Sequence, residues 1–534
     1  MPALSVVPAA PDAWSTLLGR PDVVLDGGTL HLVHDTVTPE QARVADLLLT
    51  ADVLEKAGIG VTLIRHDRSV TALVVDIERA REAMAALAVA GRDEPLYVKA
   101  RRRPAQRAVD ADLPAGTPTS LRVFRPRLTS SGLRYGASLG ARLEFWRFGE
   151  ELVEAPNDNA LTRRLTPTVD LSTATVDRYG RTWRTIDGMF DPLPAEFTED
   201  VDLVFSWVDG SASDFQRQRA ARLAEYVVGE GDDGPARFRH VDELRYALRS
   251  VHMHAPWVRR IFIATDSPAP AWLLDHPKVS IVRSEEFFAD PSVLPTHNSH
   301  AVEAQLHRIP GLAEHFLYSN DDMFFGRRVE PEMFFTPAGI SKFVECEVRI
   351  GAGEPATHRS GHDNGLRVNR ALLRSRFGRS IVRDLEHCAT PLRRSVMAEL
   401  EQTFAADFAR TAASRFRAAT DISVTNSLYH YYALMTGRAV PTTQPRTRYV
   451  QTTLAASLRR MERLAERGDV DMFCLNDGGE TEVPEQLRTR VVRETLERMF
   501  PVRAPWERAE TSAAVRSLSA AERSARLAHP SARR

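Results

Sequence analysis

An alternation of apolar runs and amphipathic segments constrains the fold of this chain more than any other feature. Four apolar runs have the length and composition of buried strands, and they cover residues 201–207, 261–265, 279–282 and 316–319. Two segments between them have helical periodicity, residues 242–253 and 299–309. Asp242 is the predicted N-cap of the first helix, and Pro256 lies just beyond its end. Such alternation predicts an α/β fold with a Rossmann-like, mostly parallel sheet.

The rest of the chain is organised around this segment. Residues 1–197 are predicted to form a separate α+β N-terminal module, and residues 198–340 the Rossmann-like half of a catalytic domain. Residues 341–506 are predicted to form its mostly helical half, and the stretch 507–534, rich in Ala, Arg and Ser, a disordered tail. A glycine- and aspartate-rich insertion at residues 229–235 is predicted to be a mobile surface loop. The first module holds no catalytic constellation of residues.

Polar residues follow each of the four predicted strands. They are Trp207 and Asp209 after the first strand, Asp266 after the second, Glu285 and Glu286 after the third, and Asn320, Asp321 and Asp322 after the fourth. Ligands of open α/β sheets bind beyond the carboxyl ends of the strands. A single acid at such a place is an ordinary turn residue, but four polar ends in register predict a crevice for a metal–nucleotide.

The adjacent carboxylates Asp321 and Asp322 lie between two apolar runs. Burying two like charges is costly unless a cation or strong donors compensate for it. A hard divalent ion with oxygen ligands meets that need, although Asn320 and Asp321 also suit a turn or a helix cap. Residues 473–477 repeat the pattern of a strand followed by Asn and Asp, which makes Asn476 a further oxygen ligand or another turn residue.

Two helices place charged side chains where they can reach this crevice. His300, Glu303 and His307 have spacings that put them on one helical face, as a zinc triad or as an acid packed between histidines at a domain interface. Glu303 precedes Asp322 by 19 residues and can share the crevice with it. Arg245 can bind a phosphate, although exposed Glu–Arg pairing is the commoner explanation for such a helix.

His387 and Arg417 stand out in the C-terminal part only because of their surroundings. Further arginines and the aromatic run at residues 429–432 accompany them, which is compatible with a cationic pocket for a sugar phosphate. Periodicity alone favours an ordinary amphipathic helix at residues 424–435.

Composition excludes several classes of function. The 70 Lys and Arg residues nearly balance the 71 Asp and Glu residues, so no global basic field favours nucleic acid. The three cysteines form no CxxC motif, and neither a membrane-spanning run nor a secretory signal is expected, so a cytoplasmic location is predicted. The basic cluster Arg101–Arg103 is either a solvated face or a peripheral contact with the inner face of the cell membrane.

Taken together, these segments resemble the Stealth family of sugar-1-phosphate transferases. That family includes bacterial capsule and exopolysaccharide phosphotransferases and the catalytic subunits of the lysosomal GlcNAc-1-phosphotransferase. Its four conserved blocks are matched in order by residues 202–210, 237–325, 391–437 and 473–477. The family's usual Asp-Asn-Asp-Glu-Leu-Arg reads His240-Val241-Asp242-Glu243-Leu244-Arg245 here, and its His-x-Pro reads His387-Cys388-Ala389-Thr390-Pro391.

The resemblance implies roles for particular residues. The matches to the family's active site are Glu303, Asp322, His387 and Arg417. Residues implied to bind substrate are Trp207, Asp209, Arg245, Arg367 and Asn369, and those implied to bind Mg²⁺ or Mn²⁺ are Asp322, Asp321 and Asn476.

The reaction that the resemblance implies is transfer of hexose-1-phosphate from a UDP-sugar to a glycan hydroxyl, with release of UMP. His387 is expected to act as general base or phosphate ligand, and Glu303 is the alternative base. A nucleotide-sugar glycosyltransferase that releases UDP, and a non-catalytic glycan-binding protein, are the alternatives from other classes. The expected partners are the UDP-sugar and the glycan acceptor, without nucleic acid, and homo-oligomer formation stays open.

Overall fold

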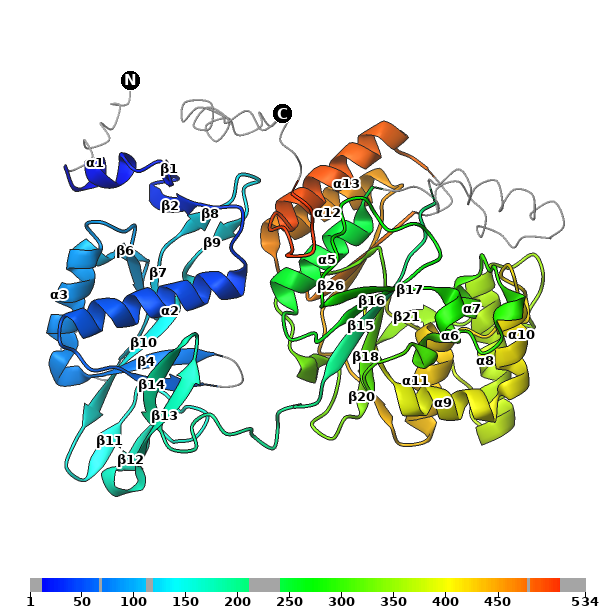
Figure 1. Cartoon of the computed structure of the whole chain (residues 1–534), viewed down its shortest axis with the longest axis horizontal. Coiled ribbons are helices and arrows are strands. Elements are labelled where there is room, and N and C mark those ends of the chain that lie inside the picture. The colour runs from blue at the N-terminus through cyan, green and yellow to red at the C-terminus, as the bar shows by residue number, and fades with distance from the viewer. Residues whose placement is uncertain (1–11, 67–69, 112–118, 211–240, 478–480, 510–534) are drawn as a thin grey trace. The chain divides into compact units, whose positions relative to one another are not determined.

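The computed structural model describes residues 12–66, 70–111, 119–210, 241–477 and 481–509. The described residues form two compact units, one within residues 12–193 and the other within residues 194–509, and Figure 1 shows the elements of each. The insertion predicted at residues 229–235 lies outside the described residues. None of the described helices has the length and apolar character to cross a membrane.

The N-terminal unit is built on an eight-stranded sheet with the order β12-β11-β10-β7-β5-β6, to which β4 and β3 are added through β10. Its core packs α2 and α3 against strands β3, β4, β7 and β10, around buried residues such as Leu54, Leu87 and Phe145. The helices of this unit are α1 (Asp12–Leu18), α2 (Pro39–Lys56) and α3 (Ala80–Ala90). Its strands are β1 (Val23–Asp26), β2 (Thr29–Val33), β3 (Thr62–Arg65), β4 (Thr71–Asp76), β5 (Tyr97–Ala100), β6 (Gln106–Arg107), β7 (Thr119–Phe124), β8 (Arg127–Leu128), β9 (Arg134–Tyr135), β10 (Ala141–Phe148), β11 (Leu152–Glu154), β12 (Leu165–Pro167), β13 (Thr173–Arg178) and β14 (Arg181–Ile186).

The second unit is built on a five-stranded sheet with the order β17-β16-β15-β18-β23. The four predicted strands form it as β15 (Val201–Ser206), β16 (Ile261–Ala264), β17 (Val279–Val282) and β18 (His315–Asn320), and they are all parallel. β23 (Thr390–Arg393) adds an antiparallel edge beside β18. The strands are continuous apolar runs because both faces of such a sheet are covered, so the prediction of a mostly parallel sheet is confirmed.

One face of this sheet packs on helices from later in the chain. Val204, Phe262 and Phe316 share one apolar cluster with Leu366 and Leu428. The helices of this unit are α5 (Glu243–His254), α6 (Ser284–Phe287), α7 (Ser299–Glu303), α8 (Gly361–Phe377), α9 (Arg394–Thr403), α10 (Ala405–Ala413), α11 (Tyr429–Met435), α12 (Ala455–Arg467) and α13 (Glu485–Met499). Its remaining strands are β19 (Met323–Phe325), β20 (Ser341–Phe343), β21 (Glu345–Arg349), β22 (Arg383–Leu385), β24 (Ala439–Pro441), β25 (Thr447–Gln451) and β26 (Met472–Asn476).

Three predictions about helices need correction. The helix predicted at 299–309 ends as α7 at Glu303 and is followed by a 3₁₀ turn, Leu306–Arg308. That turn stops before Ile309, whose helical backbone Pro310 disfavours. Asp242 stands at the N-cap position of α5 but has left-handed backbone and makes no side-chain cap. The helix predicted at 424–435 begins with a π-helical turn, Val424–Leu428, before α11.

The C-terminal part adds short strands to its helices. Residues 341–506 contain strands as well as helices, and β26 pairs with β25 and with β19 in a separate three-stranded sheet. The disordered tail was predicted to begin at residue 507, but residues 507–509 belong to the folded second unit. Glu507 is buried and accepts hydrogen bonds from the Arg249 guanidinium, whose Nε lies 2.9 Å from its Oε1, whereas residues 510–534 lie outside the described residues.

Candidate active site

The carboxyl ends of β15 and β18 lie side by side. Ser206 is the register partner of Asn320, so the residues that follow each strand leave the sheet at neighbouring points. Trp207 is buried there, and the Asp209 backbone N–H donates to Ser267 Oγ at 2.9 Å. The acids after β16 and β17 make hydrogen bonds to residues close by. Asp266 accepts hydrogen bonds from Ser284, and Glu286 accepts one from the Arg283 N–H.

Glu303 is the central buried acid of this region. Its Oε2 accepts a hydrogen bond from Thr425 Oγ1 at 2.7 Å, and its Oε1 lies 3.2 Å from the Tyr318 hydroxyl, which also lies 2.8 Å from Asn320 Oδ1. Burial raises the pKa of the Glu303 carboxyl, although the Thr425 hydrogen bond and the charge of Arg417 act against it. Glu303 is therefore more basic than an exposed glutamate, in a site where the hydroxyls of Thr425 and Tyr318 contact it.

Arg417 is held between α7 and α8. Its Nη2 donates to Ser299 Oγ at 2.8 Å, and its aliphatic stem lies on Gly361, where an added Cβ would stand 2.6 Å from Arg417 Cδ. The loop that carries Arg417 is fixed to the start of α7, because Asn298 Nδ2 donates to Asp421 Oδ2 at 2.8 Å. Gly361 thus gives the Arg417 side chain the room that it occupies.

His387 lies in the loop between β22 and β23, next to two residues that we did not single out from the sequence. His362 Nε2 lies 2.7 Å from Asp384 Oδ2, and the rings of His362 and His387 have centroids 5.8 Å apart. Burial lowers the pKa of His387, so its imidazole is neutral at physiological pH. These three side chains form a group that could hold a metal ion, with ligand atoms within 4.8 Å of one another.

The predicted Mg²⁺ ligands lie in the turn before β19 and at the end of β26. The Leu475 N–H donates to the Asp322 carbonyl at 2.9 Å, and the pairing of Met323 with Cys474 places Asp321 across from Asn476. The pKa of the Cys474 thiol is raised well above its ordinary value by burial and then by the Asp322 carboxylate, with which it hydrogen-bonds. The donor set of two carboxylates and one amide, all partly exposed, fits a hard cation.

Three predicted substrate ligands are engaged within the protein. Arg245 Nε donates to Glu507 Oε2 at 2.8 Å, and Arg367 pairs with Asp363 and donates to the Ala352 carbonyl. Asn369 is fully buried, and its amide bonds both the N–H and the carbonyl of Ser423. Arg245 and Asn369 thus have contacts within the protein, and their predicted contacts with substrate stay predictions.

The alternative zinc triad on the helix at 299–309 is not formed. His307 Nε2 lies 2.8 Å from Glu401 Oε2, in the 3₁₀ turn beyond α7. Within the described residues, the one group of metal-ligating side chains is instead His362, Asp384 and His387. The spacing of Asp384 and His387 was a visible signal, whereas His362 lies 22 residues before Asp384 and joins it only in the fold.

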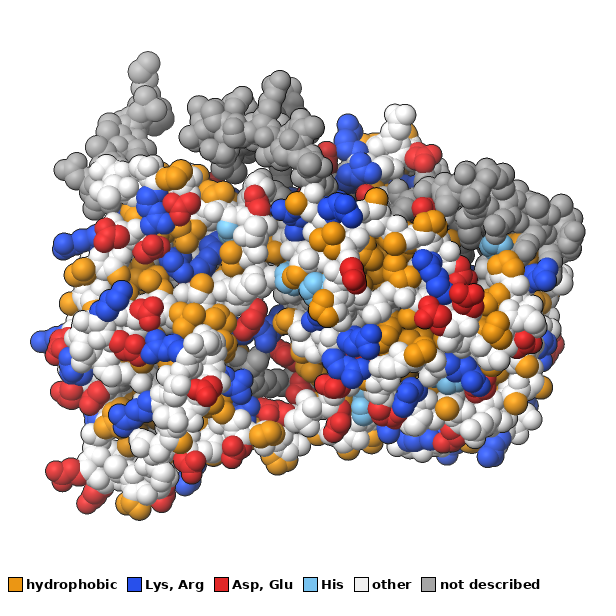
Figure 2. Space-filling model, in the orientation of Figure 1, with side chains coloured by type: hydrophobic (Ala, Val, Ile, Leu, Met, Phe, Trp, Pro, Cys, Tyr) orange, Lys and Arg blue, Asp and Glu red, His pale blue; other side chains and the backbone are white. Residues whose placement is uncertain are grey.

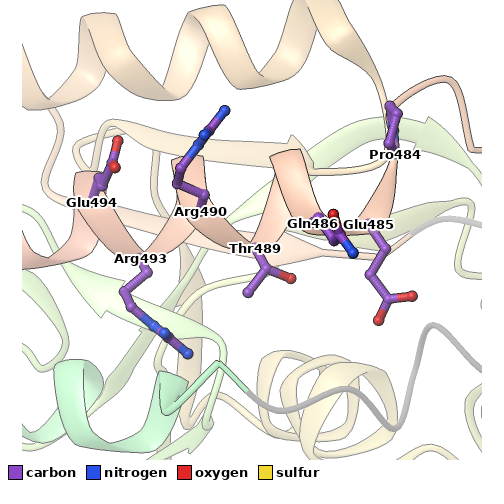
Figure 3. A pocket seen from close by; sticks show the side chains of 7 residues that line it. All are labelled: Pro484, Glu485, Gln486, Thr489, Arg490, Arg493 and Glu494. Carbon is purple, nitrogen blue, oxygen red and sulfur yellow. The ribbon is translucent and has the colours of Figure 1, made fainter.

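A hollow on the surface of α13 lies apart from these residues. Figure 3 shows its lining, which consists of Pro484, Glu485, Gln486, Thr489, Arg490, Arg493 and Glu494. The face of the molecule in Figure 2 has acidic and basic side chains interspersed.

Comparison with known proteins places the same residues in conserved regions of one family. Three family models match: Stealth protein CR2, conserved region 2, at residues 237–343; CR3, conserved region 3, at 386–434; and CR4, conserved region 4, at 463–517. Exopolysaccharide phosphotransferase CpsY of Mycobacterium tuberculosis (strain H37Rv) is 49% identical over 493 residues, which cover 92% of this chain and 93% of the relative. The chain belongs to the Stealth family of phosphotransferases.

The Stealth regions contain every catalytic candidate that the sequence suggested. Glu303 and Asp322 lie in region 2, His387 and Arg417 in region 3, and Asn476 in region 4. Two further relatives share the name exopolysaccharide phosphotransferase. That of Nocardia farcinica is 60% identical, covering 68% of this chain and 72% of its own, and SCO6021 of Streptomyces coelicolor is 37% identical, covering 94% and 95%.

One solved structure was also compared with this Stealth protein. It is the galactosyltransferase LgtC in complex with donor and acceptor sugar analogs, with 10% identity and a TM-score of 0.28 over 55% of this chain and 95% of that one. Similarity at this level supports no inference about mechanism.

Proposed function

We propose that this Stealth protein is an exopolysaccharide phosphotransferase that moves hexose-1-phosphate from a UDP-sugar to a hydroxyl of a glycan acceptor. The observation that carries the proposal is the convergence of Glu303, Arg417 and the His362–Asp384–His387 group. The charges of Arg417 and His362 both act on Glu303, and His387 lies beside His362. The names of the relatives support an exopolysaccharide product, and all of these residues lie in the unit of residues 194–510.

The reaction breaks the pyrophosphate and leaves the sugar's anomeric bond intact. The acceptor oxygen attacks the β-phosphorus, the bond from that phosphorus to the bridging oxygen breaks, and UMP departs with the α-phosphate. The acceptor loses its proton to a base. Phosphoryl transfer of this kind depends on alignment and neutralisation of charge more than on covalent chemistry.

Arg417 is the proposed phosphate ligand. A guanidinium can donate two parallel hydrogen bonds to phosphate oxygens, and Ser299 and Gly361 fix the direction of this one. Asp322, Asp321 and Asn476 are the proposed ligands of Mg²⁺ or Mn²⁺, which when bound neutralises diphosphate charge. Trp207 and Asp209, beside the end of β18, are proposed to contact the nucleotide.

Two groups can accept the acceptor's proton. Burial keeps the imidazole of His387 neutral, so it has a lone pair available. Burial raises the pKa of Glu303, which suits this carboxyl to hold a sugar hydroxyl by hydrogen bonds as well as to exchange a proton. Comparing the turnover of His387→Gln and Glu303→Gln proteins distinguishes these roles.

The experiment is a donor screen with purified full-length protein, Mg²⁺, a panel of UDP-hexoses and short glycan acceptors. Nucleotide products are separated by chromatography. We expect UMP that depends on the acceptor and is lost in Arg417→Ala, with Arg415→Ala as the exposed control from the same loop. Acceptor-dependent UDP would contradict the proposal and indicate a glycosyltransferase.

A further inference from the structure

His362, Asp384 and His387 come from three separate places in the chain and meet around one point. His362 is the second residue of α8, Asp384 lies in β22, and His387 lies in the loop after β22. Each offers one ligand atom, and these atoms all lie within 4.8 Å of one another. Ligands bound to one zinc ion at about 2.0–2.2 Å are themselves roughly 3.5 Å apart, so small side-chain rotations bring all three into coordination.

The three side chains are held in place by the surrounding protein. The buried Asp384 accepts a hydrogen bond from the Leu385 N–H at its Oδ1, at 2.8 Å, while its Oδ2 faces His362. The His387 ring lies between His362 and Tyr449, with centroid distances of 5.8 and 5.4 Å. Support of this kind orients metal ligands and raises affinity.

We propose that His362, Asp384 and His387 bind a transition-metal ion such as Zn²⁺, at a site distinct from the Mg²⁺ site proposed at Asp322. Imidazole nitrogens select zinc, copper or nickel, whereas Mg²⁺ prefers carboxylate and water oxygens. A hydrogen bond between His362 and Asp384 accounts for the positions of these two side chains without an ion, but it does not account for the position of His387 beside them. Three protein ligands leave one coordination position open, as in catalytic zinc sites.

The site has a consequence for the reaction, which rests on the proposed function. Coordination occupies the lone pair that His387 would need as a base, so the bound state leaves Glu303 as the acceptor of the proton. The open position could take the acceptor hydroxyl, whose proton a metal ion makes more acidic. Metal binding itself does not depend on this assignment.

The test measures metal binding without any sugar nucleotide. Full-length protein is stripped with a chelator and titrated with Zn²⁺ by calorimetry, and with Co²⁺ by visible absorption. His362→Ala, Asp384→Ala and His387→Ala are compared with His358→Ala, an exposed histidine just before α8. His362→Gln and His387→Gln replace any variant whose circular dichroism shows that it fails to fold.

We expect wild type and His358→Ala to bind one Zn²⁺ per chain and to give the same Co²⁺ spectrum. Each ligand variant should bind at least about 100-fold more weakly, because even outer-shell changes cost about 10–100-fold. Absence of Zn²⁺ binding to wild type, or equal binding by the folded ligand variants and His358→Ala, would overturn the proposal. Neither result bears on whether UMP or UDP is released, which tests the proposed function separately.

Discussion

Glu144 in the N-terminal unit and Glu303 in the second unit are both deeply buried carboxyls, but their surroundings differ. Burial tends to raise the pKa of Glu144, yet hydrogen bonds from His66 and Trp146 outweigh it and leave the pKa lowered. Burial prevails at Glu303, whose pKa is raised because its bonded partners are the hydroxyls of Thr425 and Tyr318. The protein stabilises the ionised form of the Glu144 carboxyl through hydrogen bonds from His66 and Trp146. At Glu303 such stabilisation only partly offsets the cost of burying the negative charge.

Two arginine sites, one in each unit, also differ in the contacts that they make. Asp46 in the N-terminal unit is bonded by both Arg125 and Arg127, at 2.9 and 2.8 Å. Arg417 in the second unit donates to the Ser299 hydroxyl. A guanidinium can stabilise the fold by pairing with an internal carboxylate, and it can also bind the oxygens of an anionic ligand. We therefore expect substitutions in the N-terminal unit to affect stability, and those around Glu303 to affect turnover.

The largest effect is expected from Arg417→Ala. Loss of a guanidinium that stabilises a transferring phosphoryl group costs about 10³-fold or more in turnover. Rates of UMP release at saturating donor measure this. Thermal unfolding should change little, and turnover within a few-fold of wild type would show that Arg417 does not contact the phosphate.

Gly361→Ala tests whether the position of Arg417 matters as much as its charge. The added methyl would stand 2.6 Å from Arg417 Cδ and must displace that side chain. We expect turnover to fall by about 10²-fold, as misplacement of a catalytic group by about 1 Å does. Gly378, at the other end of α8, offers no matched control because its backbone is left-handed. Hydrogen exchange of the Ala356 amide, which donates to Asn364, instead checks that the start of α8 stays folded in the Gly361→Ala protein.

Glu144→Gln should behave in the opposite way to Glu303→Gln. Loss of the charge that bonds His66 and Trp146 is expected to cost about 2–3 kcal/mol of unfolding free energy, measured by urea denaturation. Glu303→Gln should lower turnover by about 10²-fold or more with a smaller change in stability. If both variants lost stability equally and kept their turnover, the distinction between the two acids would fail.

The smallest effect is in the pH dependence of stability. The pKa of Glu144 is lowered on folding, so its stabilisation is present above the ordinary Glu value of about 4.3 and is lost as pH falls through the folded pKa. The pKa of Glu303 is raised, so its contribution is full below about 4.3 and is lost as pH rises through the folded pKa. Urea unfolding of each Gln variant against wild type should therefore show differences of opposite slope, of about 1 kcal/mol. If the stability difference from wild type changed with pH in the same direction for both Gln variants, the opposite pKa shifts of Glu144 and Glu303 would be contradicted.

The sheet of the second unit was predictable because its strands are continuous apolar runs. β17 has the predicted bounds, β15 and β16 end one residue earlier than predicted, and β18 is one residue longer at each end. Glu303, Asp322, His387 and Arg417 came from a family resemblance, and the matched conserved regions contain all four. Local pattern and motif were sufficient for these features.

Contacts between residues far apart in the chain could not be predicted. The sequence did not show that Glu507, 262 residues further along the chain, accepts a hydrogen bond from Arg245. Nor did it show that the amide of Asn369 fixes the backbone at Ser423. His362 joins Asp384 only because α8 begins beside β22. Charged residues alone do not reveal which partner the fold will bring to them.

The most direct test of the central claim follows the donor's β-phosphate. A UDP-hexose labelled at that phosphate is incubated with the full-length protein, Mg²⁺ and a glycan acceptor, and the label is located after separation of glycan from nucleotide. The account predicts that the label moves to the glycan while unlabelled UMP accumulates, and that Arg417→Ala abolishes this transfer. Label that remains in UDP while the sugar alone reaches the glycan would contradict it.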